Sequence, residues 1–274
     1  MITKEELVSR SKVPKFKIIS NGGFGTGKTF LSMTAPKWAY AMIEPNGIMT
    51  AMSNPQLMEN MVHYEDLVPT KLDLKQCFDA KIPNYLAKVR QDIEAGLVET
   101  FILDNLSHLS ENRWMYIDTF EPAIVMKAGK STKDNRSQYG NLGRWLYKFI
   151  LTEIVSLPCN VFVNVHIMDE TEEQETSSGE NKQVKTGSII TNTLGGFRED
   201  AAGLFNANIF LEVKNLPEGK YEYQAICRPT TKYPTAKNNI GLPQIVKNIS
   251  FQTLCESIGL NKQATKKEEV NVTK

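Results

Sequence analysis

The chain has 274 residues, a hydrophobic content of 41% and a formal net charge of +1. A chain of this length can form one sizeable α/β domain or two small ones. The near-neutral charge excludes a protein that attracts nucleic acid or membrane through its overall charge, so a polyanion site would have to come from local segregation of charge.

The cysteines and the apolar runs indicate a soluble protein of a reducing compartment. The four cysteines lie far apart and form no Cys-x-x-Cys pair, which argues against a disulfide scaffold and a zinc site: Cys77, Cys159, Cys227 and Cys255. The N-terminus has no apolar signal-peptide core, and no apolar run reaches the length of a transmembrane helix. We therefore expect a cytoplasmic protein without a membrane partner. Its expected parts are an N-terminal extension at residues 1–13, a folded core at 14–260 and a disordered polar tail at 261–274.

The first predicted elements are a short apolar strand at residues 16–20 and a glycine-rich turn directly after it. The turn matches the phosphate-loop pattern G-x-x-x-x-G-K-[ST], in which backbone N–H groups bind phosphate oxygens; a turn that merely caps a helix is the alternative. Glycines leave room for this approach and permit positive φ. Lys28 would reach the outer phosphates and the Thr29 hydroxyl would hold Mg²⁺. The residues expected to bind a nucleoside triphosphate are Gly22, Gly23, Phe24, Gly25, Thr26, Gly27, Lys28, Thr29 and Phe30.

Helical and strand patterns alternate from the phosphate loop to residue 156. Buried strands are predicted at residues 39–44 and 100–104. Helices are predicted at residues 29–34, 56–63, 83–95, 105–119 and 140–156. Residues 121–139 are rich in Gly, Lys and Ser, which indicates a loop.

A third buried strand is predicted at residues 159–167, because its apolar run is typical of a parallel sheet covered on both faces. Residues 169–192 are polar and unpatterned. The later elements are a short helix at 198–205, a β-hairpin with strands at 208–213 and 221–227, and a final helix at 251–258. Together these elements predict an α/β fold: a mostly parallel sheet with helices on both faces and an antiparallel hairpin at the C-terminal edge.

Two carboxylates at predicted strand ends are candidates for the chemistry of nucleotide hydrolysis. Asp104 ends the strand at 100–104, where a carboxylate of the Walker B type reaches the Mg²⁺ shell; an ordinary Asp that caps the next helix is the alternative. Asn105 stands where many ATPases carry the glutamate that activates water. Glu44 ends another strand and would lie at the same sheet edge. We therefore predict Glu44 as the general base, against a solvated turn carboxylate.

His166 closes the third strand, where a polar residue can sense the γ-phosphate and signal to the following loop; a structural histidine is the alternative. Asn164 is a weaker candidate for the same role. Guanine recognition would need an Asn/Thr-Lys-x-Asp motif late in the chain. The match at residues 70–73 precedes Asp104, which is the wrong order. We therefore expect ATP and Mg²⁺ as the ligands.

Clustered basic residues between positions 125 and 142 suggest a contact with nucleic acid. Only Asp134 opposes them, and such a flexible basic loop can neutralise the phosphates of single-stranded DNA while an aromatic ring stacks on a base. A solvated loop with ordinary surface lysines is the alternative. The candidate DNA-binding residues are Lys127, Lys130, Lys133, Arg136 and Tyr139.

Two later segments are weaker candidates. The segment at 169–187 is acidic in its first part and carries Lys182 and Lys185 in its second. Residues 228–243 contain Lys237, which could reach the γ-phosphate of a neighbouring subunit and stabilise charge there. A surface loop with ordinary basic residues is the alternative for this segment.

The order of these motifs resembles the phage-encoded nucleotide-binding proteins with a trimmed RecA core, whose studied members act as single-strand DNA annealing proteins in recombination. The resemblance covers residues 14–256. It rests on residues 22–29, the strand end Glu44-Pro45, residues 102–105, Tyr139-Gly140, residues 157–161, His166 and residues 236–243.

The resemblance implies a RecA-like ATPase that assembles into a homo-oligomer, ring or filament, in the host cytoplasm. It implies that residues 127–136 correspond to the first DNA-binding loop of RecA-like proteins and that Lys237 reaches across a subunit interface. Asn239 stands where relatives often carry Arg, which speaks against vigorous hydrolysis. A single-strand binding protein is the natural partner that the resemblance suggests.

Three functional hypotheses follow. The first is an ATP-dependent protein that binds and anneals single-stranded DNA, with weak, DNA-stimulated hydrolysis. The second is a motor or loader ATPase that acts on duplex DNA or a protein partner, against which Asn105 speaks. The third is a P-loop kinase of a small phosphate acceptor, which would want an arginine-rich lid between Asp104 and the next strand.

Overall fold

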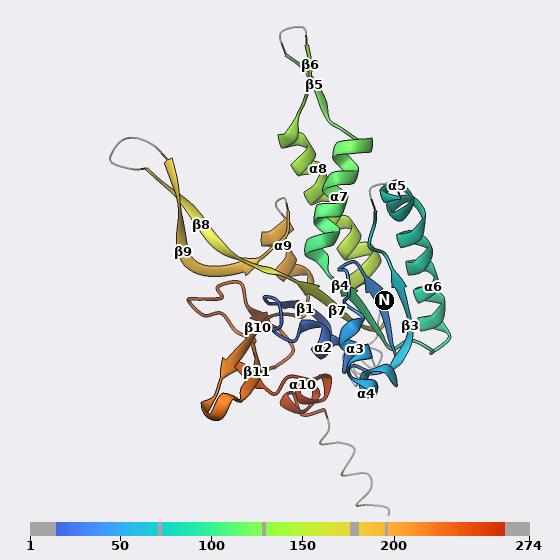
Figure 1. The fold of residues 1–274 in the computed structure, drawn as a ribbon, viewed down its shortest axis with the longest axis vertical. Helices are drawn as coiled ribbons and strands as arrows, with labels where there is room; N and C mark the ends of the chain where they lie inside the picture. Colours follow the sequence, from blue (N-terminus) through green and yellow to red (C-terminus); the bar gives the residue numbers. More distant parts are fainter. Residues whose placement is uncertain (1–14, 71–72, 128–129, 176–180, 195–196, 261–274) are drawn as a thin grey trace, which may run out of the picture.

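A computed structural model describes residues 15–70, 73–127, 130–175, 181–194 and 197–260. The predicted extension at residues 1–13 and the predicted tail at 261–274 lie outside the described residues. In the described ranges, a nine-stranded central sheet carries helices on both faces, and two hairpins project from this folded core (Figure 1). No described helix is long and apolar enough to cross a membrane.

The central sheet is parallel through most of its width. Its parallel strands, in spatial order, are β10 (Ala207–Asn215), β1 (Lys17–Asn21), β7 (Asn160–Val165), β4 (Thr100–Asp104), β2 (Trp38–Met42) and β3 (Met61–Asp66). Three antiparallel strands lie at the β10 edge: β11 (Tyr221–Ile226), β12 (Lys237–Asn238) and β13 (Ile245–Lys247). The predicted parallel sheet with an antiparallel C-terminal edge is confirmed.

Side chains of the central strands alternate between two apolar cores. In β4, Phe101 enters one core and Ile102 the other. Helices α6 (Ile82–Glu94), α7 (Leu106–Phe120) and α8 (Asn135–Phe149) cover the first core. Helices α2 (Lys28–Met33), α3 (Met49–Met52) and α10 (Phe251–Ser257) cover the second. Burial on both faces explains why these strands are continuous apolar runs in the sequence.

The remaining helical segments are short. They are α4 (Pro55–Met58), α5 (Leu74–Gln76), the π-helical turns η1 (Cys77–Lys81) and η2 (Ile150–Val155), α9 (Phe197–Leu204) and the 3₁₀ turn η3 (Pro217–Gly219). The predicted helices at 29–34, 83–95, 105–119, 198–205 and 251–258 are confirmed to within a few residues.

The helix predicted at residues 56–63 is wrong in its second half. After α4 the chain forms β3, which pairs in parallel with β2 at the edge of the sheet. Most β3 side chains are exposed, so the strand carries no hydrophobic period that a sequence pattern could reveal. Its pairing with β2 decides its conformation.

Two segments predicted as loops are antiparallel hairpins. Residues 121–139 contain β5 (Ile124–Lys127) and β6 (Lys130–Lys133), and the described residues between 169 and 191 belong to β8 (Ile167–Glu175) and β9 (Asn181–Thr191). Polar pairs across the strands link β8 to β9: Lys185 is ion-paired with Asp169, and Gln183 donates to Glu173. Such polar pairs obscure the alternation of apolar residues, which is why the sequence pattern missed the β8–β9 hairpin.

Helix α8 begins five residues before the predicted start at residue 140. Asp134 caps it by accepting a hydrogen bond of 3.3 Å from the backbone N–H of Ser137, an arrangement that is common at helix N-termini. Arg136 and Tyr139 therefore lie in the first turns of a helix and not in a loop. Beyond Phe149 the helix continues as η2.

Candidate nucleotide-binding site

The predicted phosphate loop leaves β1 at the middle of the sheet and enters α2 at Lys28. Gly25 and Gly27 have φ of +73° and +89°, values that favour glycine. A Cβ at Gly22 would lie 2.2 Å from Oγ1 of Thr26, so this position also requires glycine. The N–H of Gly22 donates to the carbonyl of Val165 at 3.1 Å, which fastens the loop to the end of β7.

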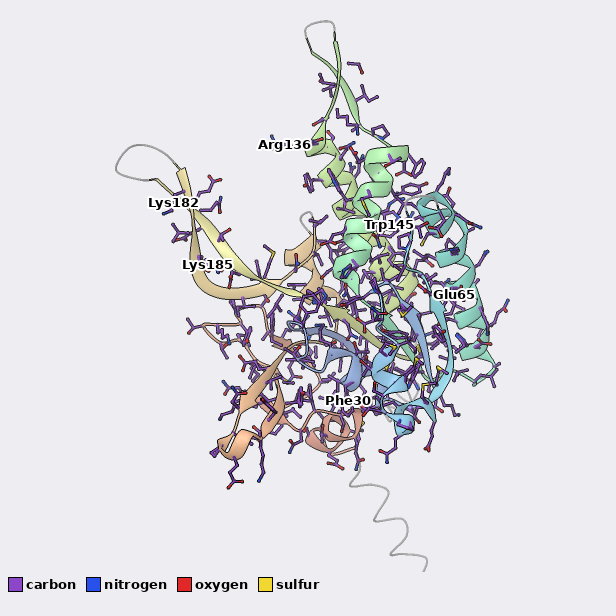
Figure 2. All side chains as sticks on the ribbon, viewed as in Figure 1. Phe30, Glu65, Arg136, Trp145, Lys182 and Lys185 are labelled. Atoms are coloured by element: carbon purple, nitrogen blue, oxygen red, sulfur yellow. The ribbon has the colours of Figure 1, made fainter. Side chains whose placement is uncertain are left out.

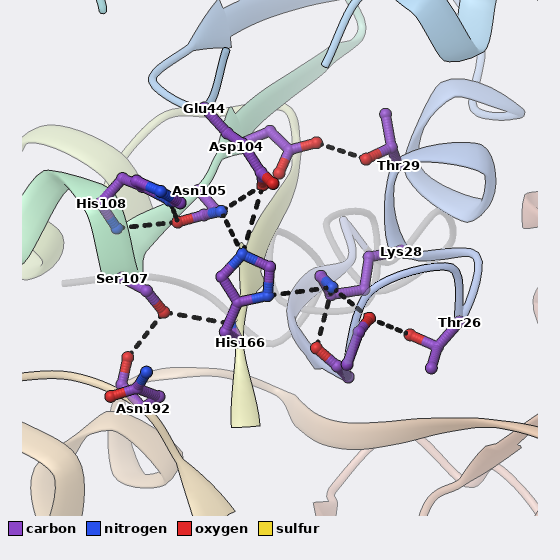
Figure 3. Close-up of polar contacts among 12 residues, drawn as sticks. Thr26, Lys28, Thr29, Glu44, Asp104, Asn105, Ser107, His108, His166 and Asn192 are labelled. Carbon is purple, nitrogen blue, oxygen red and sulfur yellow. Dashed lines mark hydrogen bonds and ion pairs between the residues drawn. The ribbon is translucent and has the colours of Figure 1, made fainter. Parts of the chain in front are cut away.

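The ammonium of Lys28 lies inside the loop. It donates to the carbonyls of Gly22 and Gly23, at 2.8 Å each, and lies 3.5 Å from Nδ1 of His166 (Figure 3). Burial lowers the pKa of Lys28 below its usual value, and the charges of Asp104 and Glu44 oppose that shift. A phosphate chain at the loop would supply a further negative charge for this buried ammonium.

Asp104 and Thr29, the two predicted magnesium ligands, are in direct contact. The Thr29 hydroxyl donates to Oδ2 of Asp104 at 2.6 Å, and the Tyr40 hydroxyl donates to the same oxygen at 3.1 Å. Oδ1 of Asp104 is buried and accepts no hydrogen bond of normal geometry from the described residues, although Asn164 stands beside Asp104 in the adjacent strand. A hydroxyl and a carboxylate with a free oxygen form a donor set that suits Mg²⁺, so these residues fit the ion.

Glu44 lies beside Asp104, as the shared sheet edge predicts. Strand β2 ends at Met42, two residues before Glu44, where the predicted strand ended. The N–H groups of Ile43 and Glu44 both donate to the carbonyl of Asp104, at 2.6 and 3.0 Å. The Glu44 carboxylate accepts from Nδ2 of Asn105 and lies 3.4 Å from Nε2 of His166. Its hydrogen bond with His166 lowers the pKa of Glu44, which keeps the carboxylate ionised and makes it a weaker base than an ordinary glutamate.

His166 joins three parts of the site. Its ring lies between Lys28 and Glu44, and Nε2 is 3.0 Å from Nδ2 of Asn105. Its backbone N–H donates to the Ser107 hydroxyl at 3.0 Å, and that hydroxyl donates to the carbonyl of Asn192 at 2.6 Å. Because His166 immediately precedes β8 and Asn192 immediately follows β9, these bonds connect the phosphate loop to the base of a projecting hairpin (Figure 3).

Asn164, the weaker sensor candidate, lies within the sheet. Its Oδ1 accepts from the Ser20 hydroxyl at 2.6 Å and its amide donates to Ser32 at 3.3 Å. These bonds hold β7, β1 and α2 together.

Glu44, His108 and His166 place three potential metal-ligating atoms within 4.8 Å of one another. Asn105 already occupies the space between two of them, since its amide contacts both Glu44 and His166. His108 in turn lies 3.1 Å from Oδ1 of Asn105 through Nδ1. The cluster is therefore explained by hydrogen bonds.

A cavity of about 770 Å³ opens above the phosphate loop. Besides the loop, Glu44 and His166, its lining includes residues that the sequence reasoning missed: Pro45, Asn46, Gly47, Thr50, Tyr223, Asn248, Ile249 and Ser250. Phe30, predicted to bind the nucleotide, also lines it and is labelled in Figure 2. Tyr223 lies so close to the loop that a Cβ on Gly27 would be 3.2 Å from its ring. No sequence signal identifies these residues. Strand pairing in the sheet brings β11 and the turn after β13 close to the phosphate loop, although they are distant from it in the chain.

The predicted DNA-binding residues gather at the far end of α7 and α8, away from the cavity (Figure 1). Lys127 and Lys130 are opposite each other in the β5–β6 hairpin. Lys133 is ion-paired with Asp118 at 2.7 Å. Tyr139 stacks on Trp114 of α7, with ring centroids 4.1 Å apart.

Lys237 does not line the cavity. Its ammonium donates to the carbonyls of Ala202 and Gly203, at 3.0 and 3.4 Å, at the C-terminal end of α9. This contact stabilises the helix end in its own chain. The role across a subunit interface stays a prediction.

Asp104→Asn tests the electrostatics of this site. Burial raises the pKa of Asp104 above its ordinary value of 3.8, so the ionised carboxylate opposes folding at neutral pH. The substitution should increase the free energy of unfolding at pH 7 by about 1–2 kcal/mol. The gain should shrink as the pH falls towards 4, where the folded protein holds the proton. Urea unfolding at both pH values measures this, with the exposed Asp66→Asn as control. If the Asp104→Asn protein is less stable than the wild type at pH 7, the ionised Asp104 carboxylate does not oppose folding.

The sequence matches no protein-family model and no curated protein. The solved structures that align with parts of the fold include the following two. A KaiC-like protein from the hyperthermophilic archaeon Pyrococcus horikoshii OT3 aligns over 77% of this chain and 77% of its own, with 9% identity and a TM-score of 0.34. An ATPase from the type III secretion system of pathogenic bacteria aligns over 72% of this chain and 51% of its own, with 12% identity and a TM-score of 0.39. This chain thus spans about half the length of that ATPase. At such scores neither likeness bears on the activity of this chain.

Proposed function

We propose that the chain binds ATP with Mg²⁺ and hydrolyses it in the cavity above residues 22–29. The observation that carries the proposal is the 2.6 Å contact between the Thr29 hydroxyl and the Asp104 carboxylate, beside the buried ammonium of Lys28. Residues 75 positions apart in the chain thereby form the oxygen donor pair that Mg²⁺ requires next to a phosphate-binding loop.

Each residue of the site has a separate role in ATP hydrolysis. Lys28 and the loop N–H groups bind the phosphates, and Thr29 and Asp104 hold Mg²⁺, which offsets charge on the phosphate oxygens when bound. Glu44 accepts the proton of the attacking water. Asn105 and His166 orient the Glu44 carboxylate through the contacts described above. Asn105 thus supports the base where many ATPases carry the base itself.

We further propose that the protein is a RecA-like, homo-oligomeric ATPase that binds single-stranded DNA and promotes its annealing in recombination. Support comes from the order of the sequence motifs and from the basic hairpin β5–β6 with the start of α8. Arg136 is exposed at the end of α8 next to this hairpin (Figure 2), and the Tyr139 ring is held in place by Trp114. Cations beside an exposed aromatic ring suit a single strand. A single-strand binding protein is the proposed partner.

Lys28→Ala should weaken ATP binding by about 100-fold or more, because it removes the charge-assisted hydrogen bonds to the phosphates. The fold should remain, since neighbouring carbonyls can bind water in place of the ammonium. Isothermal titration with ATP and Mg²⁺ measures the affinity, and Lys37→Ala, an exposed lysine paired with Glu99, is the control. Retained ATP affinity in Lys28→Ala would overturn the assignment of the phosphate loop.

Glu44→Gln should leave ATP binding intact and reduce the rate of hydrolysis by at least about 100-fold, because an amide cannot accept the proton of water. Phosphate release under saturating ATP measures the rate. Glu65→Gln, an exposed glutamate of β3, serves as the matched control. Unchanged turnover in Glu44→Gln would move the base to another residue.

Binding of a labelled thirty-nucleotide oligo-dT strand, followed by fluorescence anisotropy over a salt series, tests the DNA part of the proposal. We expect tighter binding with ATP and Mg²⁺ than without. The logarithm of the affinity should fall with the logarithm of salt concentration, by about 0.7 for each phosphate contact. If no single strand binds in any nucleotide state, the chain is a P-loop ATPase whose target is duplex DNA, a protein or a small molecule.

A further inference from the structure

Helix α8 carries three cations and no carboxylate over its fifteen residues. The cations are Arg136, Arg144 and Lys148. Among the described residues none of them forms a salt bridge, and Arg144 contacts only the carbonyl of Gly140 and the amide oxygen of Asn141. The next acid along the chain, Glu153, is ion-paired with Arg90. Asp134 caps the start of the helix, and the fifteen residues of the helix themselves carry three positive charges and no negative one.

The cations share the exposed side of α8 with two tyrosines. Tyr139 is 43% exposed and Tyr147 is 41% exposed, and their separation of eight residues corresponds to about 12 Å along the helix. Leu142, Leu146 and Phe149 occupy the opposite, buried side. We refer to this exposed side as the outer face of α8; it consists of Arg136, Tyr139, Gly140, Arg144, Tyr147 and Lys148.

Gly140 lies at the centre of the outer face. A Cβ at this position would meet no atom within 4 Å, so no packing within the chain requires a glycine there. Glycine costs about 1 kcal/mol relative to alanine inside a helix. Because Gly140 has no side chain, the helix backbone is open between Arg136 and Tyr147, and a planar ring can approach it closely.

We propose that the outer face of α8 binds single-stranded nucleic acid, with Tyr147 and Tyr139 stacking on unpaired bases and Arg136, Arg144 and Lys148 contacting phosphates. The inference rests on the proposed function and extends it: the strand continues from the β5–β6 hairpin along α8 towards η2. Only a single strand offers both a row of phosphates and free base faces, which is the combination that exposed tyrosines among unpaired cations match.

The alternative binding partner for the outer face of α8 is a second copy of this chain, which would make the contact with its acidic strand β8. The β8 acids are less suited to this contact because they already have partners in their own hairpin. Asp169 is paired with Lys185, Glu170 accepts from Thr186, and Glu173 accepts from Gln183. The paired acids offer little charge for α8, and strand β8 has no aromatic surface that would match the tyrosines.

The test compares two double variants that each remove one tyrosine and one lysine from an exposed position. Tyr147→Ala/Lys148→Ala changes the outer face of α8. Lys220→Ala/Tyr221→Ala changes the first residue of β11 and the residue before it, and Tyr221 is 66% exposed. The probe is the labelled oligo-dT strand with ATP and Mg²⁺. We expect the dissociation constant of the α8 variant to rise by about tenfold or more. Its salt slope should fall by about 0.7, while the β11 variant stays within about twofold of wild type.

Three readouts separate the outcomes. Wild-type protein that binds no single strand removes the proposed function and this inference together. Wild-type binding that the α8 variant retains, at unchanged affinity and salt slope, removes the inference alone. Sedimentation velocity without DNA detects the alternative binding partner: an α8 variant that loses both its assembly and its DNA binding shows that a second copy, and not the strand, covers the outer face.

A conservative double variant distinguishes the loss of stacking and charge from a loss of folding. Tyr147→Phe/Lys148→Arg keeps the ring and the charge and should bind the strand with an affinity within about twofold of wild type. All variants should bind ATP like the wild type, because no residue of the outer face lines the cavity. An equal loss of affinity in the conservative and the alanine variants would overturn the stacking role.

Discussion

The parallel pairing of β1, β7, β4 and β2 is the constraint on which the site depends. Parallel strands end at the same edge, so the register places Asp104 beside both Met42 and Asn164, and Asn21 beside Val165. The phosphate loop, Glu44 and His166 follow directly from these strand ends. Burial on both faces fixes the register, because a slip of one residue would turn every apolar side chain to the opposite core. The chemistry is therefore positioned by the packing of the sheet.

The same packing makes the site electrostatically costly. Asp104 is fully surrounded by protein, which raises its pKa, and Lys28 is buried nearby, which lowers its pKa. The charge of Asp104 opposes the shift of Lys28, and hydrogen bonds from Thr29 and Tyr40 oppose the shift of Asp104. A site of this kind is preorganised for charged ligands and less stable than an apolar replacement would be, which is a common compromise between function and stability.

His166 connects this site to the projecting parts of the molecule. Its side chain lies between Lys28 and Glu44, while its backbone is fixed through Ser107 and Asn192 to both ends of the β8–β9 hairpin. A change of charge near Lys28 therefore acts on a residue that forms the base of a long hairpin. The β5–β6 hairpin is attached differently, through α7 and α8, whose contact includes the stacked rings of Trp114 and Tyr139.

The sequence by itself determined the local features: the phosphate loop, the apolar strands, Asp104 at a strand end and Glu44 just beyond one. Glycine placement and apolar runs are properties of adjacent residues. It also predicted the parallel sheet with an antiparallel C-terminal edge. It missed the β8–β9 hairpin, whose polar cross-strand pairs obscure the hydrophobic period. It also missed the short β5–β6 hairpin and the early start of α8, which lie in a segment rich in Gly, Lys and Ser. Only the tertiary structure decided that Asn105 and His166 hold Glu44, that Tyr223 packs against Gly27, and that the cations of α8 share one exposed face. These contacts join residues distant in the chain, and strand order and packing alone bring them together.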